Sequence, residues 1–341
     1  MLKHRDIRPL SLLPVLLVVL IGTSCVATRP DEPAPTATSD SPREAPPPFP
    51  APAPDVAEPR DPARTWIVLL GTGTPGSEPD RSGPATAIVA NGNAYLIDAG
   101  PGVVRRAAAA SIVSGLAALY PTNVRVAFFT HLHSDHTLGY PDLILSPWVL
   151  GRSEPLLVYG PPGVAAMTTA LLEAYREDIR ARVEGPERLR RDHLAVQARE
   201  VMPGLIFDDG VLQVEAFAVP HGTPDRAYGF KLTTADRTIV MSGDSGPFDG
   251  LAAVATGADV LIHEAYGAEG LRDRDAEIQR YHASEHTSAI KVGQIASEAG
   301  VGMVILTHQL HLGGETEAAL VDQVRLSFDG EVAYGRDLDV F

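Results

Sequence analysis

The stretch His131-Leu132-His133-Ser134-Asp135-His136 follows directly on the apolar residues 124–129, which predict a buried strand. Residues two apart at a strand end face the same way, so His131 and His133 can hold one ion together. The turn that follows can fold Asp135 and His136 back toward a second ion. Imidazole and carboxylate ligands suit zinc, and also manganese or iron. Three histidines and an aspartate at one strand end therefore predict a metal site.

Four further candidate residues also come just after apolar runs. His221 follows residues 214–220, Asp244 follows 238–243, His263 follows 259–262, and His308 follows 304–307. Side chains at the ends of neighbouring strands converge on one edge of a sheet, where regular elements hold them firmly. We therefore expect these residues to lie near the site formed by residues 131–136.

The remaining pattern predicts an α/β fold. Glycine turns and a hairpin around Asn91-Gly92-Asn93 separate short strands in the first part of the domain. After residue 241, apolar strands alternate with helical segments, an order that favours sheets covered by helices. The predicted strands are 65–70, 87–90, 94–97, 123–130, 156–159, several within 205–241, 260–263, 303–307 and 331–334. The predicted helices are 101–119, 164–182, 284–299 and 315–327.

The first residues are typical of an export signal. Lys3, Arg5 and Arg8 precede an apolar run at residues 10–21, which is too short to span a bilayer comfortably. Small residues then lead to Cys25, as in the cleavage site of a bacterial lipoprotein. We expect a signal peptide at 1–24, lipid on Cys25, and an exported protein in the periplasm or on the cell surface. A plain secretory signal or an uncleaved anchor are the alternatives.

Proline and alanine dominate the segment after Cys25, which favours an extended linker over residues 25–64 and a folded domain over 65–341. Because Cys25 is the single cysteine, the chain can form no internal disulfide, and no thiolate can serve in the folded domain. The formal net charge of −15 repels nucleic acid at long range, so nucleic acid is not the expected partner.

These motifs together resemble the metallo-β-lactamase superfamily, over about residues 65–341. The chain is most similar to the branch that holds ribonuclease Z and certain arylsulfatases and phosphodiesterases. The supporting pieces, besides residues 131–136, are Gly71-Thr72-Gly73-Thr74, Asp98-Ala99-Gly100-Pro101-Gly102, Ser242-Gly243-Asp244, His263-Glu264-Ala265 and Leu306-Thr307-His308. The resemblance implies a four-layer αββα sandwich with the metal site at one edge between the sheets.

The resemblance also implies two divalent metal ions, above all Zn²⁺, with Mn²⁺ or Fe as alternatives. The implied ligands are His131, His133 and His221 for the first ion, Asp135, His136 and His308 for the second, and Asp244 as the bridge between them. A hydroxide held between the ions would attack the ester. His263 and Glu264 are the candidates for protonating the leaving group, and Asp135 is an alternative catalytic residue that would orient the hydroxide. His286 is expected to support the site.

Two departures weigh against a ribonuclease Z. The long basic arm expected between the third and fourth metal motifs is replaced by a short hairpin at residues 229–241. The run that directly follows His308, Gln309-Leu310-His311-Leu312, contains no arginine. The favoured hypothesis is therefore a hydrolase of small-molecule esters, acting on a sulfate ester, phosphodiester, lactone or carboxyl ester outside the cytoplasm. A ribonuclease Z-like tRNA endonuclease and a non-catalytic periplasmic binding lipoprotein are the alternatives. Loops near 73–84, 139–152 and 308–315 would set specificity, and a dimer is compatible with the sequence.

Overall fold

The computed structural model describes residues 57–222 and 226–341, which contain two β-sheets. The first sheet has the strand order β1 to β6. Its strands are β1 Trp66–Gly71, β2 Ala85–Ala90, β3 Asn93–Ile97, β4 Val126–Phe128, β5 Leu156–Gly160 and β6 Val196–Glu200. The second sheet runs in the order β13 to β7. Its strands are β7 Gly204–Asp208, β8 Gln213–Ala218, β9 Tyr228–Thr233, β10 Thr238–Met241, β11 Val260–Tyr266, β12 Met303–Leu310 and β13 Glu331–Tyr334.

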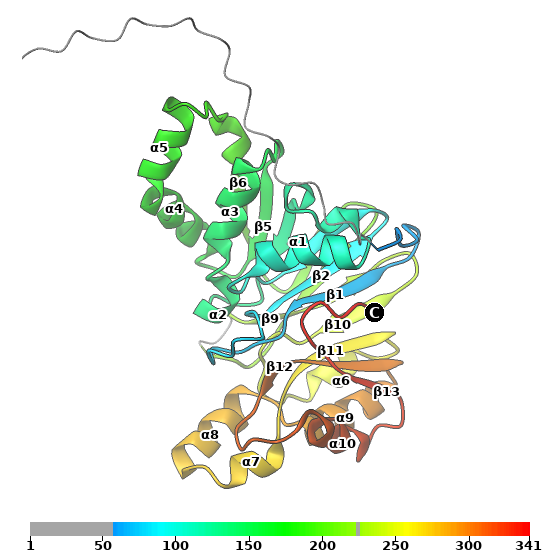
Figure 1. Cartoon of the computed structure of the whole chain (residues 1–341). Coiled ribbons are helices and arrows are strands. Elements are labelled where there is room, and N and C mark those ends of the chain that lie inside the picture. Colours follow the sequence, from blue (N-terminus) through cyan, green and yellow to red (C-terminus); the bar gives the residue numbers. More distant parts are fainter. Residues whose placement is uncertain (1–56, 223–225) are drawn as a thin grey trace, which may run out of the picture. The chain divides into compact units, whose positions relative to one another are not determined.

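Helices cover the outer face of each sheet, so the folded part is the four-layer αββα sandwich that the sequence predicts (Figure 1). The helices α1 Val103–Val113 and α3 Tyr140–Val149 lie on the first sheet, with α9 Ala289–Ala299 and α10 Glu317–Arg325 on the second. The other helices are α2 Ser134–Thr137, α4 Val164–Ala174, α5 Arg176–Glu184, α6 Gly250–Val254, α7 Ala268–Arg272 and α8 Ala276–Glu285. Short 3₁₀ turns lie at Ala117–Leu119, Pro121–Asn123 and Arg191–Leu194.

Strand alternation explains the layers. In β1, Ile67 and Leu69 belong to the core between the sheets, whereas Val68 and Leu70 pack under the helices of the first layer. Both faces are therefore apolar, as expected for strands covered on both sides. The strands β3 to β6 are parallel, and so are β10 to β13. The carboxyl ends of these strands carry several of the residues discussed below.

Several elements differ from the predicted boundaries. The helix predicted at 164–182 is two helices, α4 and α5, that change direction at Tyr175. Residues 139–152, expected as a loop, contain α3, which starts with Pro141 in its first turn and tolerates Pro147. Residues 180–191, which are rich in arginine and also contain Glu184 and Glu187, lie on a solvated, ion-paired surface, since Arg182 pairs with Asp178 and Glu187.

The ends of the predicted domain differ slightly from the structure. Backbone contacts already begin at Ala57, whose N–H donates to the Ile112 oxygen at 3.1 Å, and Arg60 donates to Ser114. The end of the predicted linker therefore lies against α1. The predicted signal peptide and Cys25 lie outside the described residues. Within the described ranges, no helix is long and apolar enough to cross a membrane.

Candidate metal centre

The seven predicted ligands lie together at the edge between the two sheets. His131 and His133 follow β4, and Asp135 and His136 lie in the short helix α2. The other three come from the second sheet. His221 follows β8, Asp244 follows β10, and His308 lies in β12. Both sheets therefore supply ligands to one site.

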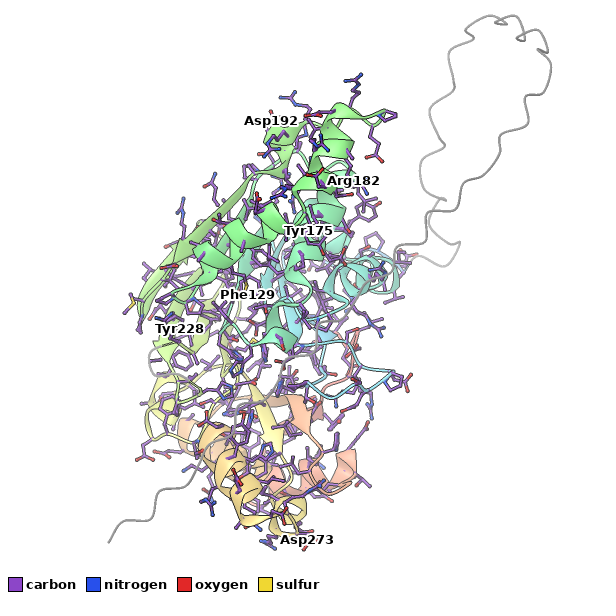
Figure 2. All side chains as sticks on the ribbon, turned by 90° about the vertical axis from the view of Figure 1, so that its left-hand side faces the viewer. Phe129, Tyr175, Arg182, Asp192, Tyr228 and Asp273 are labelled. Carbon is purple, nitrogen blue, oxygen red and sulfur yellow. The ribbon has the colours of Figure 1, made fainter. Side chains whose placement is uncertain are left out.

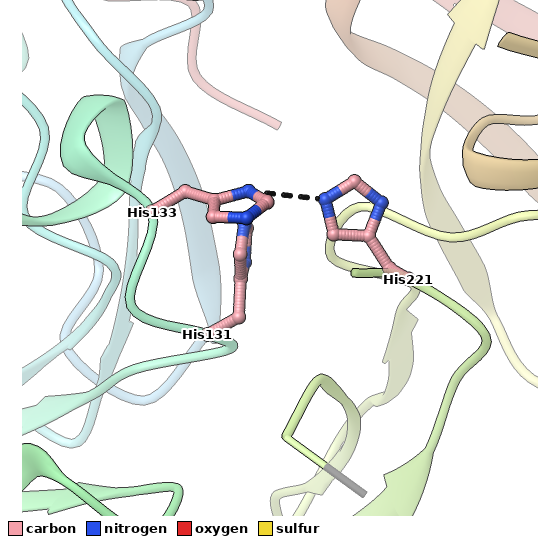
Figure 3. Close-up of side chains that lie close together, drawn as sticks. All are labelled: His131, His133 and His221. Carbon is pink, nitrogen blue, oxygen red and sulfur yellow. Dashed lines mark hydrogen bonds between the residues drawn. The ribbon is translucent and has the colours of Figure 1, made fainter. Parts of the chain in front are cut away.

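Three histidines form the first cluster (Figure 3). The potential ligand atoms of His131, His133 and His221 lie within 4.8 Å of one another, and His221 Nε2 is 3.2 Å from His133 Nδ1. The Nδ1 of His221 donates to the Glu285 carbonyl oxygen at 2.8 Å. A carbonyl only accepts, so this bond leaves the Nε2 lone pair of His221 free for a metal ion.

The second cluster contains Asp135, His136, Asp244 and His308. His308 Nε2 lies 3.2 Å from Asp135 Oδ2 and 3.4 Å from Asp244 Oδ2, and His136 Nε2 lies 3.4 Å from Asp244 Oδ1. Asp244 Oδ2 is also 3.8 Å from His221 Nε2 and 4.0 Å from His131 Nε2. Asp244 thus contacts both clusters, as a bridging carboxylate must.

These side chains fit metal ions in two respects. Two ligands about 2.0–2.1 Å from a tetrahedral zinc ion lie about 3.3 Å apart, which matches the observed separations within the second cluster. The Nε2 atoms of His131 and His136 are buried without a hydrogen-bond partner. Asp135, Asp244 and Glu264 are also buried, and no described lysine or arginine pairs with them. Buried carboxylates require positive charge, which divalent cations would supply.

The charge state of the ligands favours metal binding. Burial and the neighbouring ring of His136 hold the pKa of His131 well below its usual range, so the imidazole stays neutral. Burial alone would raise the pKa of Asp244, but the rings of His308 and His136 keep it well below its usual range. His131 therefore offers a neutral imidazole and Asp244 an ionised carboxylate, the forms that coordinate a cation. His136 differs, because the charges of Asp244 and Asp98 outweigh its burial and raise its pKa well above the usual range, so a cation would have to displace its proton.

Asp98 orients two of the ligands and was not assigned from the sequence. Its carboxylate accepts from His136 Nδ1 at 2.8 Å and from the backbone N–H and hydroxyl of Thr130, each at 2.8 Å. The Thr130 hydroxyl in turn lies 3.0 Å from His131 Nδ1. Asp98 has φ 62, a left-handed conformation that aspartate tolerates better than most residues. The position of Asp98 at the end of β3 is the sequence feature that could have identified it as a site residue.

The backbone directs His308 toward the site. The pairing of β11 with β12 shifts register after Glu264, and His308 has φ 44. A bulge of this kind re-aims one side chain without ending the strand. The strain of a left-handed histidine is therefore located at a metal ligand, where such strain is commonly found.

A glutamate–histidine pair lies beside the metal ligands. His286 Nδ1 is 3.0 Å from both carboxylate oxygens of Glu264, and the His286 ring lies 5.1 Å from that of His221. Burial and the charge of Asp244 raise the pKa of Glu264, and burial lowers the pKa of His286. The close Nδ1–carboxylate contact requires a proton between the two side chains, so the pair is a candidate proton donor.

His263 lies elsewhere. Successive residues of a strand face opposite ways, so Glu264 faces the metal ligands, whereas His263 shares its face with Leu261 and Ala265 under the outer helices. Its Nδ1 bonds to the Glu264 backbone oxygen at 2.7 Å, and it belongs to none of the metal-ligand clusters in the described residues. His286, rather than His263, therefore borders the metal ligands.

A cavity of about 350 Å³ adjoins the second cluster. Asp135 lines it together with Thr74, Ser134 and Leu138, whose side chain is 62% exposed. Arg81 also lines it and donates to the side chain of Gln309, the residue after His308. The loop of residues 73–84 thus contributes to the cavity, as the sequence predicts for a specificity loop.

Two clusters of histidine and aspartate sharing one carboxylate, with a proton-holding pair beside them, define a metal-dependent hydrolase. A family model described as the β-lactamase superfamily domain matches residues 93–309. Among curated proteins, the ribonuclease Z of Mycobacterium sp. (strain KMS) is 35% identical over 280 residues, which cover 80% of this chain and 94% of that protein. The chain belongs to the metallo-β-lactamase superfamily and is a metal-dependent hydrolase of ester bonds.

Solved structures agree on the fold. The metallo-β-lactamase fold protein YhfI from Bacillus subtilis has a TM-score of 0.61 at 19% identity, covering 81% of this chain and 98% of its own. The short form of human tRNase Z has a TM-score of 0.59 at 22% identity, with coverage of 81% and 98%. The predicted superfamily and sandwich fold are therefore confirmed.

Proposed function

We propose that the protein hydrolyses phosphodiester bonds with two zinc-type ions and acts on RNA in the manner of ribonuclease Z. The observation that carries this proposal is the bridging position of Asp244 between two ligand clusters, next to the Glu264–His286 pair. Similarity to proteins named ribonuclease Z supports it and weighs against our expectation that nucleic acid is no partner. The short hairpin is a weak objection, since those relatives align over 94% of their length.

Different residues have different roles in the proposed hydrolysis. His131, His133 and His221 would hold one ion, and Asp135, His136 and His308 the other, with Asp244 between them. When bound, such ions activate water and neutralise the negative charge of a phosphodiester. The Glu264–His286 pair delivers its proton to the leaving oxygen as the phosphorus–oxygen bond breaks. Asp98 and Glu285 hold the ligand rings in place.

A small ester outside the cytoplasm is the second candidate, as the sequence favours. The cavity of about 350 Å³ beside Asp135 has the size of a small-molecule site. Sulfate ester, lactone and carboxyl ester substrates belong to this candidate. A non-catalytic binding lipoprotein is the least favoured, since a binding site needs no proton-holding pair.

A substrate panel tests these candidates. The metal-reconstituted domain is assayed on a tRNA precursor, a short RNA, bis(p-nitrophenyl) phosphate, an aryl sulfate, a lactone and a carboxyl ester, with and without chelator. We expect chelator-sensitive cleavage of the phosphodiesters, the RNAs included. Cleavage restricted to the sulfate, lactone or carboxyl ester would establish the second candidate instead.

We also propose that the protein is exported and anchored by lipid at Cys25. The basic start and the short apolar run support this, and both lie outside the described residues. In a bacterial host, Cys25→Ala should leave the signal uncleaved or release a soluble exported form. Unchanged membrane retention and mobility would instead indicate a simple anchor.

A further inference from the structure

The helix α8 reaches the metal centre at its C-terminal end. Its last residue, Glu285, accepts the His221 ring N–H through its carbonyl and the Gly222 N–H through its carboxylate, the latter at 2.6 Å. His286, half of the proton-holding pair, follows at once. The helix therefore borders the side of the site from which the leaving group receives its proton.

One face of α8 is uncovered. None of its residues is buried. Ile278, Tyr281, His282 and Glu285 follow the i, i+3, i+4, i+7 spacing of a single helical face. Ile278 is 39% and Tyr281 52% exposed, an apolar surface on the face that ends at the metal centre.

Tyr281 lies at the outer end of a row of rings that leads inward. Its ring is 5.1 Å from His282 and 6.2 Å from His286, in edge-on arrangements of 77° and 70°. The His286 ring is stacked 6.1 Å from the metal ligand His308. Burial and the negative charges of Glu285 and Asp244 raise the pKa of Tyr281, which places it within the field of the site.

We propose that Tyr281 is a positioning residue that stacks on the nucleobase attached to the leaving oxygen of the substrate. This inference rests on the proposed phosphodiesterase function. A nucleobase is a flat ring that carries no charge, so it suits an aromatic surface beside several carboxylates. Stacking on an aromatic side chain is tolerant of sequence and is worth about 1–3 kcal/mol per base. The negative surroundings of Tyr281 favour such a ring over a further phosphate group.

Two short RNAs test the proposal. They are identical except that the nucleotide on the leaving side either carries its base or is abasic, and both are assayed with metal-loaded enzyme. Tyr281→Ala should lower kcat/KM for the base-bearing RNA about 5- to 150-fold, mainly through KM, and leave the abasic RNA unaffected. Tyr281→Phe should behave as wild type, because the ring and not the hydroxyl is required. Tyr175→Ala, at an exposed tyrosine between α4 and α5, is the control (Figure 2).

The outcomes separate the two proposals. Equal losses on both RNAs, or a Tyr281→Phe variant as impaired as Tyr281→Ala, would overturn stacking and leave phosphodiester hydrolysis intact. If the wild-type enzyme cleaves neither of the two RNAs nor bis(p-nitrophenyl) phosphate, the proposed phosphodiesterase function is wrong. The stacking proposal, which rests on it, is then wrong as well.

Discussion

Asp244 and His286 lie in the same site, but their substitution should affect metal content and activity in different ways. Asp244→Ala removes the carboxylate shared by both clusters, so metal content and activity should fall together. His286→Ala removes the proposed proton donor, so metal content should persist while the rate on a poor leaving group falls about 10²- to 10⁴-fold. Metal content and kcat for a poor and a good leaving group measure the difference.

A good leaving group departs without a proton, so His286→Ala should matter less for a p-nitrophenyl ester than for an alkyl ester. If His286→Ala slows both esters equally, or loses metal, the prediction is wrong. His286 would then be a metal ligand or a residue that supports the ligands. His263→Ala is the comparison that decides between the two histidines, since the sequence favoured His263 as the donor.

His263 should make the fold sensitive to acid. Burial lowers its pKa to about 4, from about 6.5 in an unfolded chain. As the pH falls, His263 is therefore protonated at a higher pH in the unfolded state than in the folded state. The free energy of unfolding consequently decreases between pH 6.5 and pH 4. The loss should be about 3 kcal/mol relative to His263→Gln, which cannot titrate. Urea unfolding of both proteins at pH 7 and pH 4 measures it, and parallel losses in the two proteins would contradict the prediction.

At the scale of elements, α3 depends on a buried arginine. Pro147 cannot donate a hydrogen bond, which frees the Leu143 carbonyl one turn earlier. Arg152 Nη1 and Nη2 donate to the Leu143 and Ile144 oxygens, each at 2.9 Å. Burial lowers the pKa of Arg152 only to about 10, so it remains charged at neutral pH.

Arg152→Leu should therefore destabilise the fold by about 3 kcal/mol, because two buried carbonyls lose charged donors. Arg152→Lys should be intermediate, since one ammonium does not reproduce the paired geometry of the guanidinium. Free energies of unfolding from urea titrations measure both. Unchanged stability in Arg152→Leu would show that water replaces the side chain.

At the scale of the whole molecule, the metal centre joins the two sheets. Residues 131–136 follow β4 of the first sheet, whereas His221 and Asp244 follow strands of the second sheet and His308 lies in its strand β12. A ligand that binds only the folded state stabilises it by about 2.7 kcal/mol at 100 times its Kd. Removing the metal should therefore lower Tm by about 5 to 10 °C. Thermal unfolding with and without chelator measures this, and Asp244→Ala should show little response. A chelator-independent Tm in the wild type would contradict it.

The sequence by itself determined the parts of this protein that local patterns carry. Strand alternation and apolar runs predicted most strands, with β13 matching at both ends. The ligands were identifiable because each lies in a strand, shortly after one or, for Asp135 and His136, in the short helix α2 that follows β4, so the local chain direction already aims the side chains. The hairpin at Asn91 and Gly92 was equally local, since both residues adopt positive φ there.

Only the tertiary structure decided which residues that are far apart in the sequence contact one another. Glu264 and His286 are 22 positions apart, and Asp98 and His136 are 38 apart, so no local period connects either pair. The face on which His263 lies depended on strand alternation within a sheet covered on both sides, where both faces are apolar and the sequence pattern does not distinguish them. The helix α8 has no buried residue, so no amphipathic core pattern marked it. Its place beside the metal centre follows from its contacts with His221 and Gly222, which only the folded chain brings together.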